Sequence, residues 1–311
     1  MNADRVSTAK PARLSRLAAV PAILVALAGL TAAVLAPTYF TRVRSMGGIV
    51  SLSPSTTETL FALGLGHRLV GVSTYCNYPP EAKALPKMGD YGTPAVESIL
   101  AARPELVVVS GRGMNRMLKG LERAGIRVYC APDDSIENIA SGFEELGRLA
   151  GDAGAGRRLA SEFRDRFAKE SARTAARAES ARPLVFLETW SAPLSTVGGD
   201  TFVDELIRAA GGRNVAADLG KGYFAPAVES VIRRDPQAIV ITRMGDEGAA
   251  AAHALAGRPG WAGVRAVREG RIWADIDPDW LLRPGPRLVR GLEALRARLD
   301  EVRAANEGTA R

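Results

Sequence analysis

Short apolar runs alternate with amphipathic stretches along most of the chain after Gly48. Continuous apolar runs rich in β-branched residues are typical of strands buried on both faces, and the stretches between them have helical spacing. The pattern predicts strands at 49–52, 69–72, 106–109, 126–129, 184–187, 238–242 and 271–274, and helices at 56–63, 115–124, 136–150, 202–210 and 286–302. We therefore expect an α/β fold with mainly parallel sheets.

Residues 153–180 differ from this alternation. They are rich in Ala, Arg and Glu, lack Pro and contain no Gly after Gly156. Their narrow apolar stripe and polar remainder predict one long helix. The expected architecture is two Rossmann-like α/β lobes, residues 47–152 and 181–311, joined by a connecting helix at 153–180. Because one helix crosses only once, the lobes should rock modestly relative to each other.

An internal repeat supports two similar lobes. The letters PAVES occur at 94–98 and 226–230, and each copy is followed by a second proline and an apolar run. Each copy therefore predicts the same helix–strand unit. The repeat places Glu97 and Glu229 in the first turn of equivalent helices. A single acid there is explained by the helix dipole, at about 0.3–1 kcal/mol, but two matched carboxylates also offer a grip for arginines of a partner.

The amino terminus has the layout of an export signal. Four basic residues precede an uncharged run from Leu17 to Ala36, which is the order of a basic n-region and an apolar h-region. Its length is also about the 20 residues that a membrane-spanning helix needs. Pro37 disfavours cleavage after Ala36, so residues 1–46 are expected to be a signal or a retained anchor. The excess of basic residues before the run places the body outside the cytoplasm, as in a periplasmic protein.

Net charge argues against nucleic acid as a partner. The chain carries a formal charge of +7, but residues 1–46 hold six basic residues and one acid, which leaves 35 basic and 33 acidic residues in the remainder. A protein that neutralises many phosphates concentrates cations in its folded part. The folded part of this chain has almost equal numbers of basic and acidic residues, so we expect no nucleic acid as a partner. The expected partners are a small molecule and a membrane protein.

Motifs of common enzymes are absent from the sequence. There is no complete GxGxxG, P-loop, GxSxG or HExxH. Only His67 and His253 exist as histidines, too few for a typical first-row metal site. Cys76 and Cys130 have no metal-ligand spacing, and we expect them to be unbridged thiols. No catalytic residue, cofactor or resident metal is therefore expected.

Four segments resemble the helical-backbone (class III) periplasmic solute-binding proteins of ABC importers, in their cobalamin-binding-like branch. They are residues 49–91 with SLSPSTTETLFALG and YPPEA, the two PAVES units, and residues 277–295 with RPGPR. The resemblance covers nearly all of residues 48–300. It implies a monomer that binds a corrinoid between two lobes and delivers it to an ABC permease in the membrane. A ferric siderophore or haem is the alternative ligand. The alternative function is that of an enzyme, a bilobed tetrapyrrole chelatase.

The resemblance also implies roles for individual positions. Glu97 and Glu229 match the glutamates that dock on permease arginines. The positions implied to line the ligand cleft are Tyr75, Tyr91, Trp190, Tyr223 or Phe224, Asp279, Trp280 and Arg283. One departure weakens the case for cobalamin itself, because Ser110–Gly113 replaces an aromatic position after the strand at 106–109.

The residues themselves favour the same kind of site. Most aromatic side chains at these positions lie in Gly/Pro-rich loops at predicted strand ends, where open α/β sheets bind ligands. Rings with a polar tip suit a partly hydrated pocket for a flat ligand. A packed or solvated loop residue remains the simpler reading of each one alone. Arg112, Arg243 and Arg283 are further candidates to pair with an anionic group.

Overall fold

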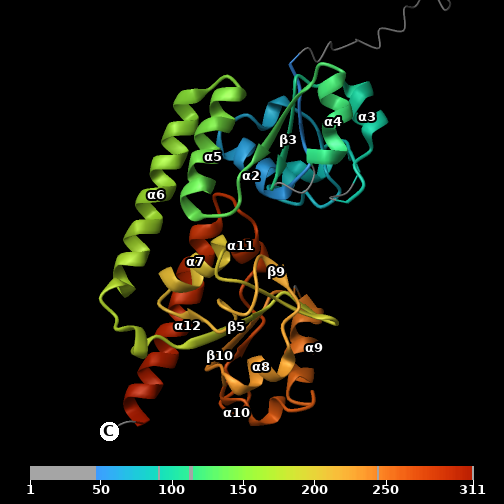
Figure 1. The fold of residues 1–311 in the computed structure, drawn as a ribbon. Coiled ribbons are helices and arrows are strands. Elements are labelled where there is room, and N and C mark those ends of the chain that lie inside the picture. Colours follow the sequence, from blue (N-terminus) through green and yellow to red (C-terminus); the bar gives the residue numbers. More distant parts are fainter. Residues whose placement is uncertain (1–46, 90–91, 112–114, 244, 310–311) are drawn as a thin grey trace, which may run out of the picture. The chain divides into compact units, whose positions relative to one another are not determined.

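The computed structural model describes residues 47–89, 92–111, 115–243 and 245–309 (Figure 1). The predicted export segment, Tyr91 and Arg112 lie outside these residues. Among the described residues, no helix combines the length and the apolar character that a membrane crossing requires.

The first lobe is built on a four-stranded sheet in the order β2-β1-β3-β4. Its strands are β1 (Ile49–Ser51), β2 (Leu69–Val72), β3 (Leu106–Ser110) and β4 (Arg127–Ala131), all parallel. Alternate residues of β3 face opposite sides. Leu106 and Val108 pack with residues of α2 (Pro54–Ala62) and α5 (Ile136–Leu149), whereas Val107 and Val109 pack with residues of α3 (Val96–Ala102) and α4 (Asn115–Arg123). Both faces are therefore buried, as the apolar runs predicted.

The second lobe repeats this plan with the order β11-β10-β5-β8. Its parallel strands are β5 (Leu184–Glu188), β8 (Arg213–Asn214), β10 (Ala238–Ile241) and β11 (Ile272–Trp273). One face packs against α7 (Phe202–Ala209) and α12 (Leu288–Thr309). The other face packs against α8 (Val228–Arg233) and α9 (Gly245–Leu255). The predicted fold class, two α/β lobes with mainly parallel sheets, is confirmed.

The connecting helix is α6 (Ala153–Ala175), shorter than the predicted 153–180. Asp152 begins it by accepting a hydrogen bond from the Ala155 amide at 2.8 Å. After its end the backbone becomes extended at Ala178 (φ −60°, ψ 144°), and a short 3-10 turn, η3 (Glu179–Ala181), follows. Arg182 is then extended (φ −83°, ψ 123°), as expected for the residue before Pro183. Phe163 of α6 and Phe143 of α5 join the apolar core of the second lobe.

The sequence repeat extends to backbone conformation. Each PAVES unit begins a short helix, α3 or α8, and leads into a buried strand, β3 or β10. Arg103 (φ 47°) and Asp235 (φ 49°) occupy equivalent positions between them, and they are the non-glycine residues with positive φ in the described part of the chain. The same left-handed turn, which is costly for residues with a Cβ, therefore closes both helices.

A small antiparallel sheet was not predicted. It consists of β6 (Trp190–Ser191), β7 (Leu194–Val197) and β9 (Tyr223–Phe224), in the order β6-β7-β9. Its strands are only two to four residues long, too short for a periodic signal. This sheet determines where the aromatic residues of the second lobe point.

Candidate ligand-binding cleft

A cavity of about 470 Å³ gathers residues from both lobes. The first lobe contributes the turn after β1 and the segments after β3 and β4, so the cavity lies at the carboxyl ends of parallel strands, where open α/β sheets bind ligands. The second lobe contributes the start of α7, the β9 region and the segment after α11 (Pro278–Leu282). The lining residues are Ser53, Pro54, Ser55, Ser110, Gly111, Asp133, Asp134, Asp200, Thr201, Phe202, Gly222, Tyr223, Leu282, Arg283 and Pro284.

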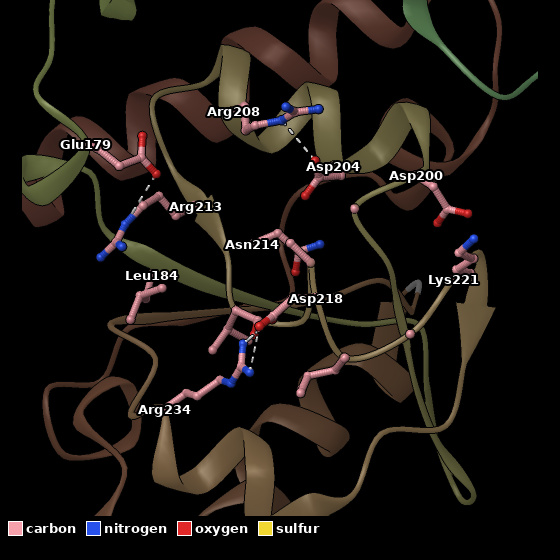
Figure 2. A pocket seen from close by; sticks show the side chains of 15 residues that line it. Glu179, Leu184, Asp200, Asp204, Arg208, Arg213, Asn214, Asp218, Lys221 and Arg234 are labelled. Carbon is pink, nitrogen blue, oxygen red and sulfur yellow. Dashed lines mark hydrogen bonds and ion pairs between the residues drawn. The ribbon is translucent and has the colours of Figure 1, made fainter.

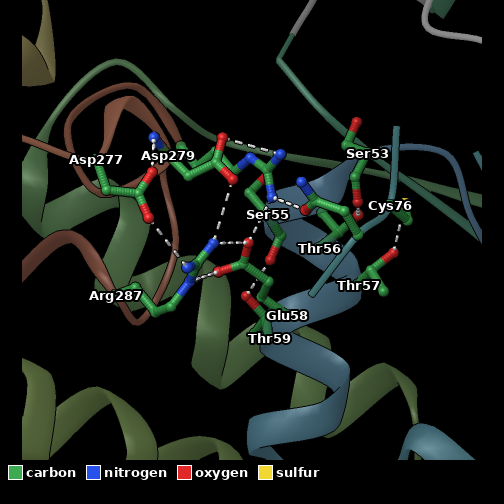
Figure 3. A network of polar contacts seen from close by, with 12 residues as sticks. Ser53, Ser55, Thr56, Thr57, Glu58, Thr59, Cys76, Asp277, Asp279 and Arg287 are labelled. Carbon is green, nitrogen blue, oxygen red and sulfur yellow. Dashed lines mark hydrogen bonds and ion pairs between the residues drawn. The ribbon is translucent and has the colours of Figure 1, made fainter. Parts of the chain in front are cut away.

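Buried hydroxyl groups stabilise the first-lobe wall of this cavity. The Ser110 amide donates to Ser53 Oγ at 2.9 Å, which ties the end of β3 to the turn after β1. Beneath it, Thr57 Oγ1 donates to Ser51 Oγ at 2.8 Å and lies 3.1 Å from Cys76 Sγ. The serines and threonines of SLSPSTTETL thus satisfy one another inside the lobe (Figure 3). Cys76 and Cys130 are both unbridged, as predicted.

A charged cluster joins the lobes beside the cavity (Figure 3). Glu58 of α2 is buried, with 2% of its side chain exposed. Its carboxylate accepts from Arg287 Nε and Nη2 at 2.7 Å each and from Arg283 Nη1 at 2.9 Å. Both arginines belong to the RPGPR segment of the second lobe. We call Glu58, Asp277, Asp279, Arg283 and Arg287 the interlobe cluster.

Burial and neighbouring charges shift the pKa of two members of the interlobe cluster. Burial raises the pKa of Asp279, and the Arg283 guanidinium only partly opposes this. Burial alone would lower the pKa of Arg287, but hydrogen bonds and the charge of Glu58 raise it above its usual value. The guanidinium of Arg287 also lies 4.0 Å from the centre of the Tyr78 ring, a cation–π contact that adds to its stabilisation.

The three predicted residues near the carboxy terminus have different surroundings. Arg283 lines the cavity and also contacts Glu58, Asn77 Oδ1 (2.7 Å) and Asp279. Asp279 pairs with Arg283 at 2.9 Å and is absent from the cavity lining. The Trp280 ring is partly buried, and Arg290 lies 5.9 Å from its centre. Glu58, Asn77 and Arg287 were missed from sequence, although the Glu in TTETL stands out among hydroxyl residues.

The predicted aromatic residues of the second lobe point in different directions. Trp190 pairs with Ser195 and Tyr223 pairs with Val197 across β7, so these two side chains share one face of the small sheet. Two strand spacings and an offset of two residues along β7 put their backbones roughly 12 Å apart. Trp190 is 53% exposed and Tyr223, which lines the cavity, is 54% exposed. Phe224 lies on the opposite face and packs into the lobe core.

Another buried carboxylate supports the Trp190 region. Glu188, at the end of β5, is fully buried and accepts from Arg258 at 2.5 and 3.0 Å and from Arg243 at 3.2 Å. The Arg243 guanidinium lies 5.6 Å from the centre of the Trp190 ring. Glu188 was not predicted, and the acid that ends the apolar run LVFLE was its only signal.

Three further predicted side chains are exposed. Tyr75 follows β2 and is 59% exposed, outside the cavity lining. Glu97 and Glu229 are exposed in the first turns of α3 and α8. No ion pair joins either glutamate to another residue of the described ranges, so both carboxylates are available to a partner.

A larger hollow of about 980 Å³ lies on the second lobe alone (Figure 2). Its charged lining residues largely pair with one another. Arg208 contacts Asp204 at 2.9 Å and Arg234 Nη2 contacts Asp218 at 3.0 Å. Because opposite charges there compensate each other and the first lobe contributes nothing, the cavity between the lobes is the better candidate site. In the described part of the chain, no group of three or more His, Cys, Asp or Glu could hold a metal ion.

Comparisons with known proteins agree with this architecture. The sequence family described as periplasmic binding protein matches residues 49–278. An uncharacterized ABC transporter substrate-binding lipoprotein of Bacillus subtilis is 34% identical over 254 residues, covering 79% of this chain and 78% of that protein. A vitamin B12-binding protein of Vibrio cholerae is 31% identical over 251 residues, covering 79% and 86%. A periplasmic haem-binding protein from Pseudomonas aeruginosa is similar in structure, with a TM-score of 0.72 and 34% identity, covering 81% of this chain and 92% of that one.

Proposed function

Because this chain belongs to the periplasmic binding protein family, in which it is a substrate-binding protein of the ABC-importer type, we propose that it holds a corrinoid between its lobes. The observation that carries the proposal is the cavity at the carboxyl ends of the first sheet, faced by Tyr223 of the second lobe. Trp190 on the same face extends an aromatic surface suited to a large flat ligand.

The ligand class is supported by relatives. The protein of Vibrio cholerae described above is named for vitamin B12, which favours a corrinoid. Haem is the second candidate because the similar structure from Pseudomonas aeruginosa is named for haem. A ferric siderophore completes the set of large chelates that a cleft of this kind could accept.

Titration with cyanocobalamin tests the corrinoid assignment. Trp190 is the most exposed of the four tryptophans, since Trp261 and Trp273 are buried and Trp280 is partly buried. A corrinoid in the cleft should therefore quench Trp190 in a saturable way and release or absorb heat. Trp190→Phe should lose most of the quenching while calorimetry still detects binding. Neither heat nor quenching at tens of micromolar ligand would remove the corrinoid proposal.

We also propose that Glu97 and Glu229 dock the protein on an ABC permease. Both carboxylates are exposed at equivalent positions of the repeated unit, and exposed charges steer and orient association. The double substitution Glu97→Ala with Glu229→Ala should leave ligand affinity unchanged and abolish uptake in cells that depend on this protein. Unchanged uptake would show that docking uses another surface.

The chelatase alternative receives less support. Insertion of a metal into a tetrapyrrole needs a basic side chain in the cleft to take up protons, and neither His67 nor His253 lines the cavity. We expect no change in the absorbance spectrum when the protein is mixed with a free porphyrin and Fe²⁺ or Co²⁺. Steady metal insertion would favour the enzyme.

We infer that residues 17–36 carry the protein out of the cytoplasm and that they are either cleaved or kept as an anchor. Cell fractionation with intact-mass measurement separates these outcomes. Recovery of the full-length chain in the cytoplasm would contradict export.

A further inference from the structure

The cavity between the lobes is lined by more acids than bases. Its charged lining residues are Asp133, Asp134, Asp200 and Arg283. Arg112 follows Gly111 in the sequence and its position is not described, but adding its charge still leaves one net negative charge. The group of Arg243, Arg258 and Glu188 has a net charge of +1, but none of the three residues lines the cavity. The charged side chains of the wall therefore carry more negative than positive charge, and their carboxylates accept hydrogen bonds.

The one cationic lining residue of the described wall is already compensated. Arg283 contacts Glu58 and Asp279 at 2.9 Å each. The whole interlobe cluster contains three carboxylates and two guanidinium groups, a net charge of −1. Glu58, which is 2% exposed, lies as close to Arg283 as Asp279 does and closer to Arg287 than either aspartate, so its carboxylate compensates both guanidinium groups. Arg283 can still donate hydrogen bonds from its remaining N–H groups, but it presents little positive charge to a ligand.

We propose that the cleft selects an uncharged ligand whose rim bears carboxamides over one whose rim bears carboxylates, and that Glu58 sets this preference by cancelling the charge of Arg283. This specificity rests on the proposed function of the cleft as the ligand site. An amide N–H can donate to the lining carboxylates and serine hydroxyls, and an amide C=O can accept from Arg283. A carboxylate would instead approach the lining carboxylates, and Arg283, the one cation of the described wall, is already paired with Glu58 and Asp279.

Three probes of different charge test the proposal by calorimetry on the purified protein at one pH and one salt concentration. Cyanocobalamin bears peripheral carboxamides, its monocarboxylate derivative has one amide hydrolysed, and haemin bears two propionates. We expect the amide form to bind at least about tenfold more tightly than its monocarboxylate, which corresponds to about 1.4 kcal/mol. Haemin should bind more weakly than cyanocobalamin.

Substitutions that remove one negative charge should shrink this preference. Glu58→Gln keeps the shape of the side chain and uncovers the arginines, so the ratio of the two corrinoid affinities should fall severalfold towards one. Asp200→Asn, at an exposed position of the cavity wall, should act in the same direction and carries the test if Glu58→Gln does not fold. Glu137→Gln is the matched control, because this exposed glutamate pairs with Arg164 outside the cavity.

The outcomes separate this inference from the proposed function. If none of the three probes binds, the proposed function fails and the inference falls with it. If the monocarboxylate or haemin binds as tightly as cyanocobalamin, the ligand site stands and the charge preference is wrong. If the preference exists but neither Glu58→Gln nor Asp200→Asn changes it, the assignment to Glu58 and the cavity carboxylates is overturned.

Discussion

Removal of the Glu58 carboxylate should cost far more stability than removal of an exposed glutamate. In the folded protein this group accepts three hydrogen bonds of 2.7–2.9 Å from Arg283 and Arg287. The arginine side chains are only 16% and 12% exposed. Glu58→Ala would leave both guanidinium groups partly buried with weaker partners.

The expected loss is about 3 kcal/mol in the free energy of unfolding. Breaking a buried ion pair by removing one partner costs about 3–5 kcal/mol. The lower end applies because Asp279 still pairs with Arg283 at 2.9 Å, while its distance to Arg287 is 3.6 Å. Glu137→Ala should cost only about 0–1 kcal/mol, since 65% of that side chain is exposed in its pair with Arg164.

Urea unfolding measured by circular dichroism and tryptophan fluorescence provides the assay. In the protein without substitutions, the two signals should change at the same urea concentration, because the interlobe cluster and a shared apolar core connect the lobes. A double-mutant cycle of Glu58→Ala and Arg287→Ala should give a coupling energy of about 1–3 kcal/mol. A loss below about 1 kcal/mol for Glu58→Ala, or a coupling near zero, would refute the structural role assigned to this cluster.

Two further predictions concern local packing and ionisation. A Cβ at position 156 would lie 2.9 Å from the Glu144 carbonyl oxygen, whereas one at position 120 meets nothing within 4 Å. Gly156→Ala should therefore destabilise the protein by about 1–3 kcal/mol, and Gly120→Ala should stabilise it by about 0.5–1 kcal/mol, both checked by thermal unfolding. Burial, then Glu145 and Cys130, raise the pKa of Tyr129 from 10.0 to about 12. Because the folded pKa is the higher one, stability should fall by about 1–2 kcal/mol between pH 10 and about pH 12, after allowance for partial solvent contact. Ultraviolet titration should show a late tyrosine step that Tyr129→Phe removes, and an unchanged titration curve in that variant would contradict the shift.

Much of the fold follows from local pattern alone. Apolar runs without alternation predicted parallel strands buried on both faces, and the PAVES repeat predicted one helix–strand unit in each lobe. Both signals depend only on residues within a few turns of one another, so they can be read before any tertiary contact is known. The end of α6 differed by five residues, because the backbone becomes extended at Ala178 and no glycine or proline marks that break in the sequence.

The candidate site depends on contacts that no local pattern contains. From sequence, both Tyr223 and Phe224 were candidates for the cleft, and the register of β9 on β7 turned one toward the cavity and the other into the core. A shift of one residue in a strand exchanges its two faces. That register is set by pairing with a neighbouring strand, which the sequence of β9 alone does not specify.

The role of Glu58 is the clearest case. Local patterns predicted two α/β lobes, a repeated unit and a set of loop residues at strand ends. Only the tertiary structure brought Glu58 within hydrogen-bonding distance of Arg283 and Arg287, which are 225 and 229 residues away along the chain. Local periodicity decides which residues form a helix or strand, but the packing of the two lobes decides which buried charges meet.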